Sequence, residues 1–204
     1  MKKFVAVAGN IGVGKSTLVE KLCDRFGWEP YYEPVAENPY LEDFYEDMHG
    51  WAFHSQVFFI THRLRSHREL LLHPTSVVQD RTVYEDAEIF ARNLYEQGQI
   101  GERDYRTYQN LYGLLVDMLS PPDLVVYLRA PVETLVERIA ARARQMESSI
   151  QPAYLARLND LYEAWIARFT LCPVLEVPAD RLNYADNENH VELIADKLAQ
   201  KLSG

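Results

Sequence analysis

The chain has 204 residues, of which 48% are apolar and 25% charged, which suits one α/β domain with a substantial core and argues against disorder. A formal net charge of −9 disfavours a surface for duplex nucleic acid, because neutralising phosphates takes clustered Lys and Arg. No stretch approaches the roughly 18 apolar residues of a membrane span. The two cysteines, Cys23 and Cys172, lack a metal-site spacing, and we expect them to be reduced thiols. We therefore expect a cytoplasmic protein with no nucleic-acid or membrane partner.

Short apolar runs alternate along the chain with longer segments of helical periodicity. The runs are Lys3–Ala8, Trp28–Glu33, Ser76–Asp80, Asp123–Leu128 and Val174–Val177. The helical patterns are Lys15–Phe26, Trp51–Leu72, Tyr84–Glu96, Tyr105–Met118, Pro131–Arg144, Pro152–Phe169 and His190–Leu202. Because several runs are rich in Val, the pattern predicts strands buried on both faces, in a parallel five-stranded sheet flanked by helices. We expect a single domain over residues 1–204.

The first apolar run leads into a glycine-rich loop. Gly9–Ser16 reads GNIGVGKS, which satisfies GxxxxGK[ST], and it lies between a predicted strand and a predicted helix. Backbone N–H groups of such a loop bind phosphates, Lys15 reaches the β- and γ-phosphates, and Ser16 places its hydroxyl on Mg²⁺. The expected ATP-binding residues here are Gly9, Asn10, Ile11, Gly12, Val13, Gly14, Lys15, Ser16 and Thr17.

A phosphate loop occurs in several classes of protein. A GTPase switch is disfavoured because the chain lacks an NKxD motif for the base. A DxxG match at Asp47–Gly50 does not end an apolar strand, and we interpret it as a helix terminus.

Glu33 closes the second run, in YYEPV. Pro34 disfavours helix at the preceding residue, so the pattern places this carboxylate at a strand end, where open α/β sheets bind ligands. A carboxylate there can take the proton from a hydroxyl acceptor. The alternative is a solvated glutamate in a loop.

The long helix places Gln56, Phe59 and Arg63 on one face. A glutamine can read a base edge, and Arg63 adds donors beside it. Asp86, on the next helix, can orient Arg63 or accept from a base amino group, and Phe90 lies one turn later and can stack on a base. Spacing alone equally fits a core phenylalanine and surface polar residues.

Asp80 and Arg81 close the third run. An aspartate at a strand end can act on Mg²⁺, directly or through water, and the arginine places a positive fork near phosphate. A surface ion pair is the alternative.

The segment ERIAARARQ supplies a group of arginines. Arg138 and Arg142 lie one turn apart and Arg144 follows, which suits a lid that stabilises charge on a transferring phosphoryl group. We expect this lid at about residues 138–151, with 145–151 as a polar loop. The alternative is a solvated basic helix end. The six histidines show no metal spacing.

In order and spacing, the segments GNIGVGKST, YYEPV, NPYLEDFYED, WAFHSQVFFITHRLR, DRTVYEDAEIF and ERIAARARQME resemble the deoxynucleoside kinase family, which contains deoxycytidine, deoxyguanosine and bacterial deoxyadenosine kinases. The resemblance covers nearly the whole chain. It implies a P-loop kinase fold with an Arg-rich lid, and transfer of the ATP γ-phosphoryl group to a deoxyribonucleoside 5′-hydroxyl.

The resemblance also assigns roles by position. It implies that Glu33 is the general base, that Lys15 and Arg81 are catalytic, and that Tyr45 and Glu147 hold the sugar 3′-hydroxyl. The nucleoside-binding residues it implies are Glu33, Tyr45, Gln56, Arg63, Arg81, Asp86, Phe90 and Glu147. To the ATP site we add the lid arginines and Asp180, and to the metal site Ser16 and Asp80.

The chain departs from the family pattern near the base. Asp80 replaces the glutamate common in animal enzymes, Thr82 replaces serine, and Ser55 stands where a bulky aromatic often precedes the glutamine. These changes predict an enlarged or reshaped base pocket. Because Arg63 and Asp86 are retained, we expect a purine deoxynucleoside, adenine or guanine. The resemblance also implies a homodimer, for which the Tyr105–Met118 helix is a candidate surface.

Two other functions stay open from the sequence. A thymidylate-type nucleoside monophosphate kinase also has a phosphate loop and an Asp-Arg segment, but its acceptor is already an anion and needs no base. A catalytically silent nucleotide-binding subunit is the second alternative, although the chain keeps Lys15, Ser16 and Glu33.

Overall fold

A computed structural model describes residues 2–32, 37–143 and 150–203 of the chain. The strands are β1 (Phe4–Gly9), β2 (Glu29–Tyr31), β3 (Val77–Asp80), β4 (Leu124–Arg129) and β5 (Val174–Pro178). The helices are α1 (Lys15–Phe26), α2 (Leu41–Glu46), α3 (Met48–Leu72), α4 (Val83–Glu85), the π-helical η2 (Asp86–Ala91), α5 (Arg92–Glu96), α6 (Glu102–Met118), α7 (Val132–Arg142), α8 (Pro152–Arg168) and α9 (Glu188–Ser203).

The strands form one parallel sheet in the order β2-β3-β1-β4-β5. The central strand β1 is buried at every position and pairs with β3 on one side and β4 on the other. This arrangement confirms the predicted five-stranded parallel sheet. In the register of β1 with β3, Val7 is paired with Asp80, so the phosphate loop and Asp80 emerge at the same edge of the sheet.

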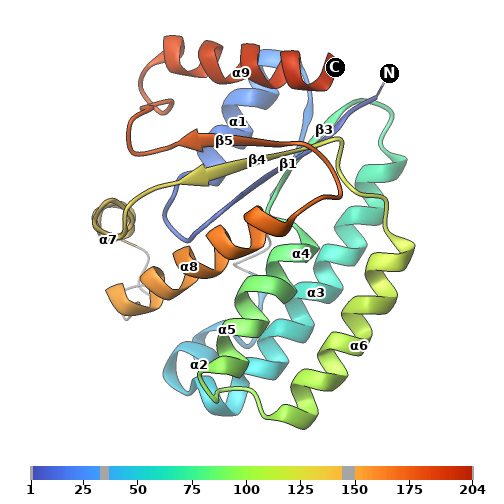
Figure 1. Ribbon diagram of the computed structural model, residues 1–204, viewed down its shortest axis with the longest axis vertical. Coiled ribbons are helices and arrows are strands. Elements are labelled where there is room, and N and C mark those ends of the chain that lie inside the picture. The colour runs from blue at the N-terminus through green and yellow to red at the C-terminus, as the bar shows by residue number, and fades with distance from the viewer. Residues whose placement is uncertain (1, 33–36, 144–149, 204) are drawn as a thin grey trace.

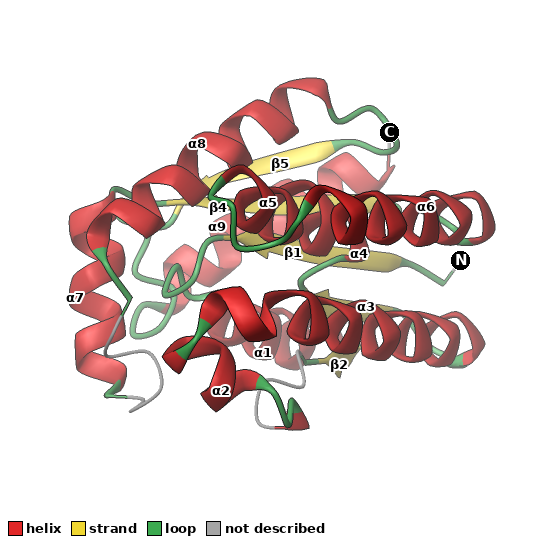
Figure 2. Cartoon of the chain, turned by 90° about the horizontal axis from the view of Figure 1, so that it is seen from below, coloured by secondary structure: helices red, strands yellow, loops and turns green. Residues whose placement is uncertain are grey.

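Helices cover both faces of the sheet (Figure 1). Helices α1 and α9 lie on one face, over a core of β-strand and helix side chains that includes Leu18, Val126 and Leu198. On the other face α3, α6 and α8 bury a second cluster that includes Ile60, Tyr108 and Tyr162. Figure 2 shows the same layers from below, with α3 and α6 running side by side.

The sheet separates the two large clusters and contributes side chains to both of them. A third, smaller cluster packs α2 against α3 and α5, around Leu41, Phe44 and Leu94. In the described part of the chain, no helix is long and apolar enough to cross a membrane.

The helices differ from the predicted segments at identifiable points. The sequence patterns did not predict α2, which has only 6 residues. The segment Tyr84–Glu96 is not one regular helix, because η2 interrupts it with π-helical turns. Pro131, expected in a first helical turn, caps α7 instead, whereas Pro152 does open α8.

The DxxG segment is a helix terminus, as predicted. Asp47 is the N-cap of α3, and its Oδ1 accepts a hydrogen bond of 3.1 Å from the Gly50 N–H. This helix therefore begins three residues before the expected Trp51, at Met48.

Candidate active site

The phosphate loop joins β1 to α1 and depends on glycine at two tight points. Gly9 and Gly14 have φ of 147° and 101°, a region that favours glycine. A Cβ on Gly14 would lie 2.6 Å from the Tyr184 hydroxyl, so a side chain there would clash with a buried ring. At the start of α1, Lys15 is only 7% exposed and its Nζ donates to the Asn10 carbonyl at 3.0 Å. The loop thus holds its lysine turned back over the backbone that would bind phosphate.

Asn10 ties this loop to helix α8. Its Nδ2 donates to the Leu155 carbonyl at 2.9 Å and to Asn159 Oδ1 at 2.8 Å, while its Oδ1 accepts from the Ile11 N–H at 2.7 Å. The Asn10 amide therefore forms its hydrogen bonds with protein groups, and these bonds hold the loop against α8 before a phosphate binds.

Ser16 and Asp80 meet beside the loop. The Ser16 Oγ donates to Asp80 Oδ2 at 2.6 Å, and Asp80 is only 3% exposed. The other carboxylate oxygen, Oδ1, is buried and has no hydrogen-bond partner among the described residues. A buried carboxylate oxygen with this free capacity, next to a hydroxyl, fits Mg²⁺, which binds proteins through one or two such groups and takes its remaining oxygens from phosphates and water.

Arg63 and Asp86 form a buried, two-pronged ion pair. Arg63 Nε lies 3.0 Å from Asp86 Oδ2 and Nη2 lies 3.2 Å from Oδ1, and both side chains are 3% exposed. Arg63 Nη1 also donates to the Asp80 carbonyl at 3.1 Å. Helix α3 is thereby joined to the end of β3, and the predicted partnership of these two residues is present. Gln56, on the same helix, is 4% exposed.

Arg81 follows β3 with an unusual backbone. Its φ of 68° lies in the left-handed region, although it is not a glycine, and its N–H donates to the Val7 carbonyl at 3.0 Å. The guanidinium lies 4.3 Å from the centre of the Phe90 ring, and Nη1 donates to the Tyr162 hydroxyl at 3.1 Å. In this structure Phe90 therefore supports Arg81, and its stacking on a base stays a prediction.

The arginine cluster of the predicted lid begins on α7. Arg138 donates to the carbonyls of Val13 at 2.8 Å and Ala179 at 2.7 Å, so it bridges the phosphate loop to the end of β5. Asp180, next to Ala179, has a side chain that is 27% exposed. Arg142 ends α7 and is exposed. Glu33, Arg144 and Glu147 lie outside the described residues, so their predicted roles stay predictions.

This geometry is that of a nucleotide-dependent enzyme, and comparison with known proteins identifies its family. The sequence profile of the deoxynucleoside kinases matches residues 5–203. The chain belongs to the deoxynucleoside kinase family. The kinase resemblance predicted from the sequence is thereby confirmed, and so is the reaction class, phosphorylation of a deoxynucleoside.

Several proteins similar to this kinase carry a named activity. It is 37% identical to the deoxyadenosine/deoxycytidine kinase of Bacillus subtilis (strain 168), over 96% of this chain and 91% of the relative. It is 31% identical to the deoxyguanosine kinase of the same organism, over 94% of each chain.

Solved structures agree with this assignment. The deoxyadenosine kinase from M. mycoides, with the products dCMP and a flexible dCDP bound, superposes with a TM-score of 0.87 at 33% identity, covering 97% of this chain and 99% of that one. The same enzyme with dATP bound gives a TM-score of 0.85 at 32% identity, with equal coverage. The P-loop kinase fold predicted from the sequence is thus confirmed.

Two side chains of this kinase lie inside the site although the sequence patterns did not single them out. Glu85 is fully buried and accepts a hydrogen bond of 3.2 Å from the Gly9 N–H. Tyr162, from α8, donates to the Gly9 carbonyl at 2.9 Å. Glu85 lies four residues after Arg81 in the resemblance segment DRTVYEDAEIF, and that proximity is the only signal in the sequence.

Tyr184 is a third residue of this kind. Its hydroxyl donates to the Val13 carbonyl at 3.0 Å, and burial raises the pKa of this phenol to about 12, against the opposing effect of Arg138. The phenol is therefore neutral at physiological pH and acts on the loop as a hydrogen-bond donor.

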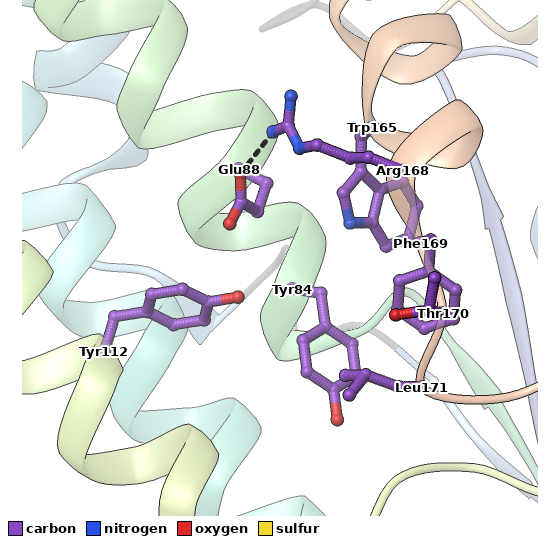
Figure 3. Close-up of a pocket in the computed structure, with 8 residues that line it drawn as sticks. All are labelled: Tyr84, Glu88, Tyr112, Trp165, Arg168, Phe169, Thr170 and Leu171. Atoms are coloured by element: carbon purple, nitrogen blue, oxygen red, sulfur yellow. Dashed lines mark hydrogen bonds and ion pairs between the residues drawn. The ribbon is translucent and has the colours of Figure 1, made fainter.

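A cavity of about 160 Å³ lies elsewhere, where α8 ends next to α4, η2 and α6 (Figure 3). Its lining residues are Tyr84, Glu88, Tyr112, Trp165, Arg168, Phe169, Thr170 and Leu171. Arg168 and Glu88 form an ion pair at its edge. None of the predicted site residues lines this cavity, so we do not assign it to the reaction.

Proposed function

We propose that this kinase transfers the γ-phosphoryl group of ATP to the 5′-hydroxyl of a purine deoxyribonucleoside, deoxyadenosine or deoxyguanosine, for nucleotide salvage. The observation that carries the proposal is that Asp80, at the end of β3, contacts both the phosphate-loop region and the Arg63–Asp86 pair. Asp80 reaches the phosphate loop through Ser16, while its carbonyl holds Arg63 of the Arg63–Asp86 pair. A phosphate site and a polar group suited to a base therefore lie on either side of one strand end.

The proposed reaction is in-line transfer. The nucleoside O5′ forms a bond to the γ-phosphorus as the bond to the β–γ bridging oxygen breaks and ADP leaves, and Glu33 takes the hydroxyl proton. Lys15 and Arg81, with the lid residues Arg138, Arg142 and Arg144, balance the charge on the transferring group. Positioning and electrostatics supply most of the acceleration.

Mg²⁺ is the proposed metal, held by Ser16 Oγ and Asp80. Ser16 and Asp80 would hold the ion, and it would supply positive charge that offsets the negative charge developing during transfer. Support comes from the buried Asp80 Oδ1, which has capacity to accept that no described residue uses.

The proposed base preference rests on the residues next to Gln56. Ser55 is fully buried beside Gln56, and its Oγ accepts from Asn38 Nδ2 at 3.0 Å. Two small polar side chains thus meet where related enzymes often carry a bulky aromatic, which leaves room for the larger base. Gln56 and the Arg63–Asp86 pair supply donors and acceptors for a purine edge.

The deciding experiment is a substrate panel with MgATP and purified enzyme. The four deoxynucleosides and their 5′-monophosphates are offered separately, and ADP release and the phosphorylated product are measured. We expect turnover of deoxyadenosine or deoxyguanosine above the pyrimidines, and none of the monophosphates. Turnover of thymidylate alone would favour the monophosphate kinase, and no turnover at all would favour the silent subunit.

The general base has its own test within this panel. Glu33→Gln keeps the shape of the side chain but removes its basicity, so we expect a loss of about 10²-fold or more in kcat. ATP binding, followed by calorimetry, should be unchanged, because Glu33 acts on the acceptor. Equal activity of the variant and the natural enzyme would remove Glu33 from the mechanism.

A homodimer through α6 is also proposed. The outer side of this helix exposes Leu111, Leu114 and Met118 at 37%, 66% and 80%, and Leu72 of α3 is 76% exposed. A row of exposed large apolar side chains on adjacent helices suits contact with a second copy. Leu114→Glu should shift the sedimentation coefficient from dimer to monomer, whereas Leu193→Glu, an equally drastic change on α9, should not.

The cellular location proposed is the cytoplasm. Cys23 and Cys172 are both free cysteines, and neither is paired in a disulfide. Thiols of this kind persist in a reducing compartment, which is also where a salvage enzyme meets ATP.

A further inference from the structure

Glu85 is a completely buried carboxylate between the phosphate loop and Arg81. Its Oε1 accepts hydrogen bonds from the Gly9 N–H at 3.2 Å and from the Tyr162 hydroxyl at 2.8 Å. Its Oε2 accepts from the Thr82 N–H at 2.7 Å and from Thr82 Oγ1 at 3.1 Å. All four partners are donors, so the site suits the ionised carboxylate.

Tyr162 extends this network to the guanidinium. The ring is fully buried, and its hydroxyl accepts from Arg81 Nη1 at 3.1 Å. The single hydroxyl hydrogen faces both Glu85 Oε1 and the Gly9 carbonyl, the latter at 2.9 Å. One phenol therefore connects the arginine that follows β3 with the first glycine of the phosphate loop.

Arg81 needs such support for a physical reason. An arginine side chain carries about 2 kcal/mol of rotamer entropy, and a freely moving guanidinium would be a poor match for one phosphate geometry. The Phe90 ring supports the plane of the guanidinium at 4.3 Å, while Tyr162 fixes one nitrogen. Glu85 adds a negative charge that balances Arg81 and Lys15 where water is excluded.

We propose that Glu85 and Tyr162 are positioning residues, which set the Arg81 guanidinium relative to Gly9 and so align acceptor and donor sides of the site. The proposal rests on the function proposed above for Arg81. Both residues act through others, since their polar atoms contact only Gly9, Arg81 and Thr82 and each other in the hydrogen bonds described.

The network has a characteristic pH response. Burial raises the pKa of Glu85, while Arg81, Lys15, the Thr82 N–H and the Tyr162 hydroxyl act in the opposite direction. As pH falls, protonation of either Glu85 oxygen turns an acceptor into a donor that faces the two donors on that oxygen, and the alignment is lost. Tyr162 does not titrate in this range, because burial raises its pKa well above 10.0. The activity should therefore decline on the acid side.

The first test is Tyr162→Phe, which removes one hydroxyl and keeps the buried ring. We expect kcat to fall about tenfold to a hundredfold, as misplacement of a catalytic group does, with little change in the KM for ATP. Tyr127→Phe is the matched control. Tyr127 is 3% exposed, its ring lies 5.8 Å from that of Tyr162, and its hydroxyl donates to Glu163 at 3.0 Å, away from the loop. The melting temperature of this control should fall by about as much as that of Tyr162→Phe, while its kcat should be unchanged.

A double-mutant cycle with Arg81→Met separates positioning from general damage. If Tyr162 acts through Arg81, then Tyr162→Phe should reduce the residual rate of the Arg81→Met enzyme by less than it reduces that of the natural enzyme. Equal factors in both backgrounds, or an unchanged kcat in Tyr162→Phe, would refute the proposal.

Glu85→Gln gives a second, independent readout if Tyr162→Phe melts too early to assay. The acid limb of the pH–kcat profile should change shape in this variant, because only the fall in rate caused by protonation of the proposed base Glu33 remains, with rates normalised to the nucleotide-binding fraction. An unchanged limb would exclude Glu85. A natural enzyme that is inactive on every deoxynucleoside would instead overturn the proposed function, so the two failures are distinguishable.

Discussion

The buried charges of Arg63 and Asp86 are balanced within the protein. Arg63 and Asp86 neutralise each other through two short contacts, and Arg63 has a third partner in the Asp80 carbonyl. Burying both charges costs desolvation free energy, which these three hydrogen bonds and the attraction between the two charges offset only while the pair is complete.

Removing one member should be severe. Asp86→Asn leaves the Arg63 cation buried without its counter-charge, and we expect a loss of about 3–5 kcal/mol in the free energy of unfolding. Urea denaturation followed by circular dichroism measures this loss. Glu192→Gln, which removes the exposed partner of Arg25, is the control and should leave the midpoint unchanged. A similar urea midpoint for both variants would contradict the expectation that an unpaired Arg63 charge destabilises the protein.

Helices and strands that adjoin a sequence motif were predictable, because the same local residues define the motif and the boundary of the element. The phosphate loop marks the start of α1 and the apolar run before Asp80 marks the end of β3, so the proximity of Ser16 and Asp80 was predictable, whereas their role in metal binding stays a prediction. Helix α2 escaped prediction because 6 residues are too few to show a helical period.

The missed network has a different cause. Tyr162 meets the Gly9 carbonyl across 153 residues of sequence, and it does so only because α8 crosses over the loop. No local pattern records such a contact. The π-helical η2 was equally hidden, since a wider turn changes the hydrogen bonding of a segment without changing its composition.

The N-cap of helix α3 should contribute to the stability of the protein. Asp47→Ala removes the side chain that accepts from the Gly50 N–H, and we expect a loss of about 1 kcal/mol in the free energy of unfolding. Glu46→Ala changes the neighbouring exposed acid, which is the last residue of α2, and should be near neutral. Thermal melts of both variants make the comparison, and equal melting temperatures would show that the cap contributes nothing.

For the whole molecule, the shared sheet predicts cooperative unfolding. Trp28 packs against the cluster under α1 and α9, whereas Trp165 belongs to the cluster on the other face. Because β1 and β4 contribute side chains to both clusters, neither can lose its packing alone. Variants whose sole tryptophan is Trp28 or Trp165, with Trp51 replaced in both, should give coincident urea midpoints by fluorescence. Separated midpoints would instead divide the chain into two folding units.

The bond between Ser16 Oγ and Asp80 Oδ2 has a consequence for the order of assembly. A free divalent cation arriving at this pair competes with a short hydrogen bond for the same carboxylate oxygen. If this pair is the metal site proposed above, its two protein groups alone would hold the cation weakly, and binding together with a triphosphate would supply the further oxygen ligands that Mg²⁺ requires.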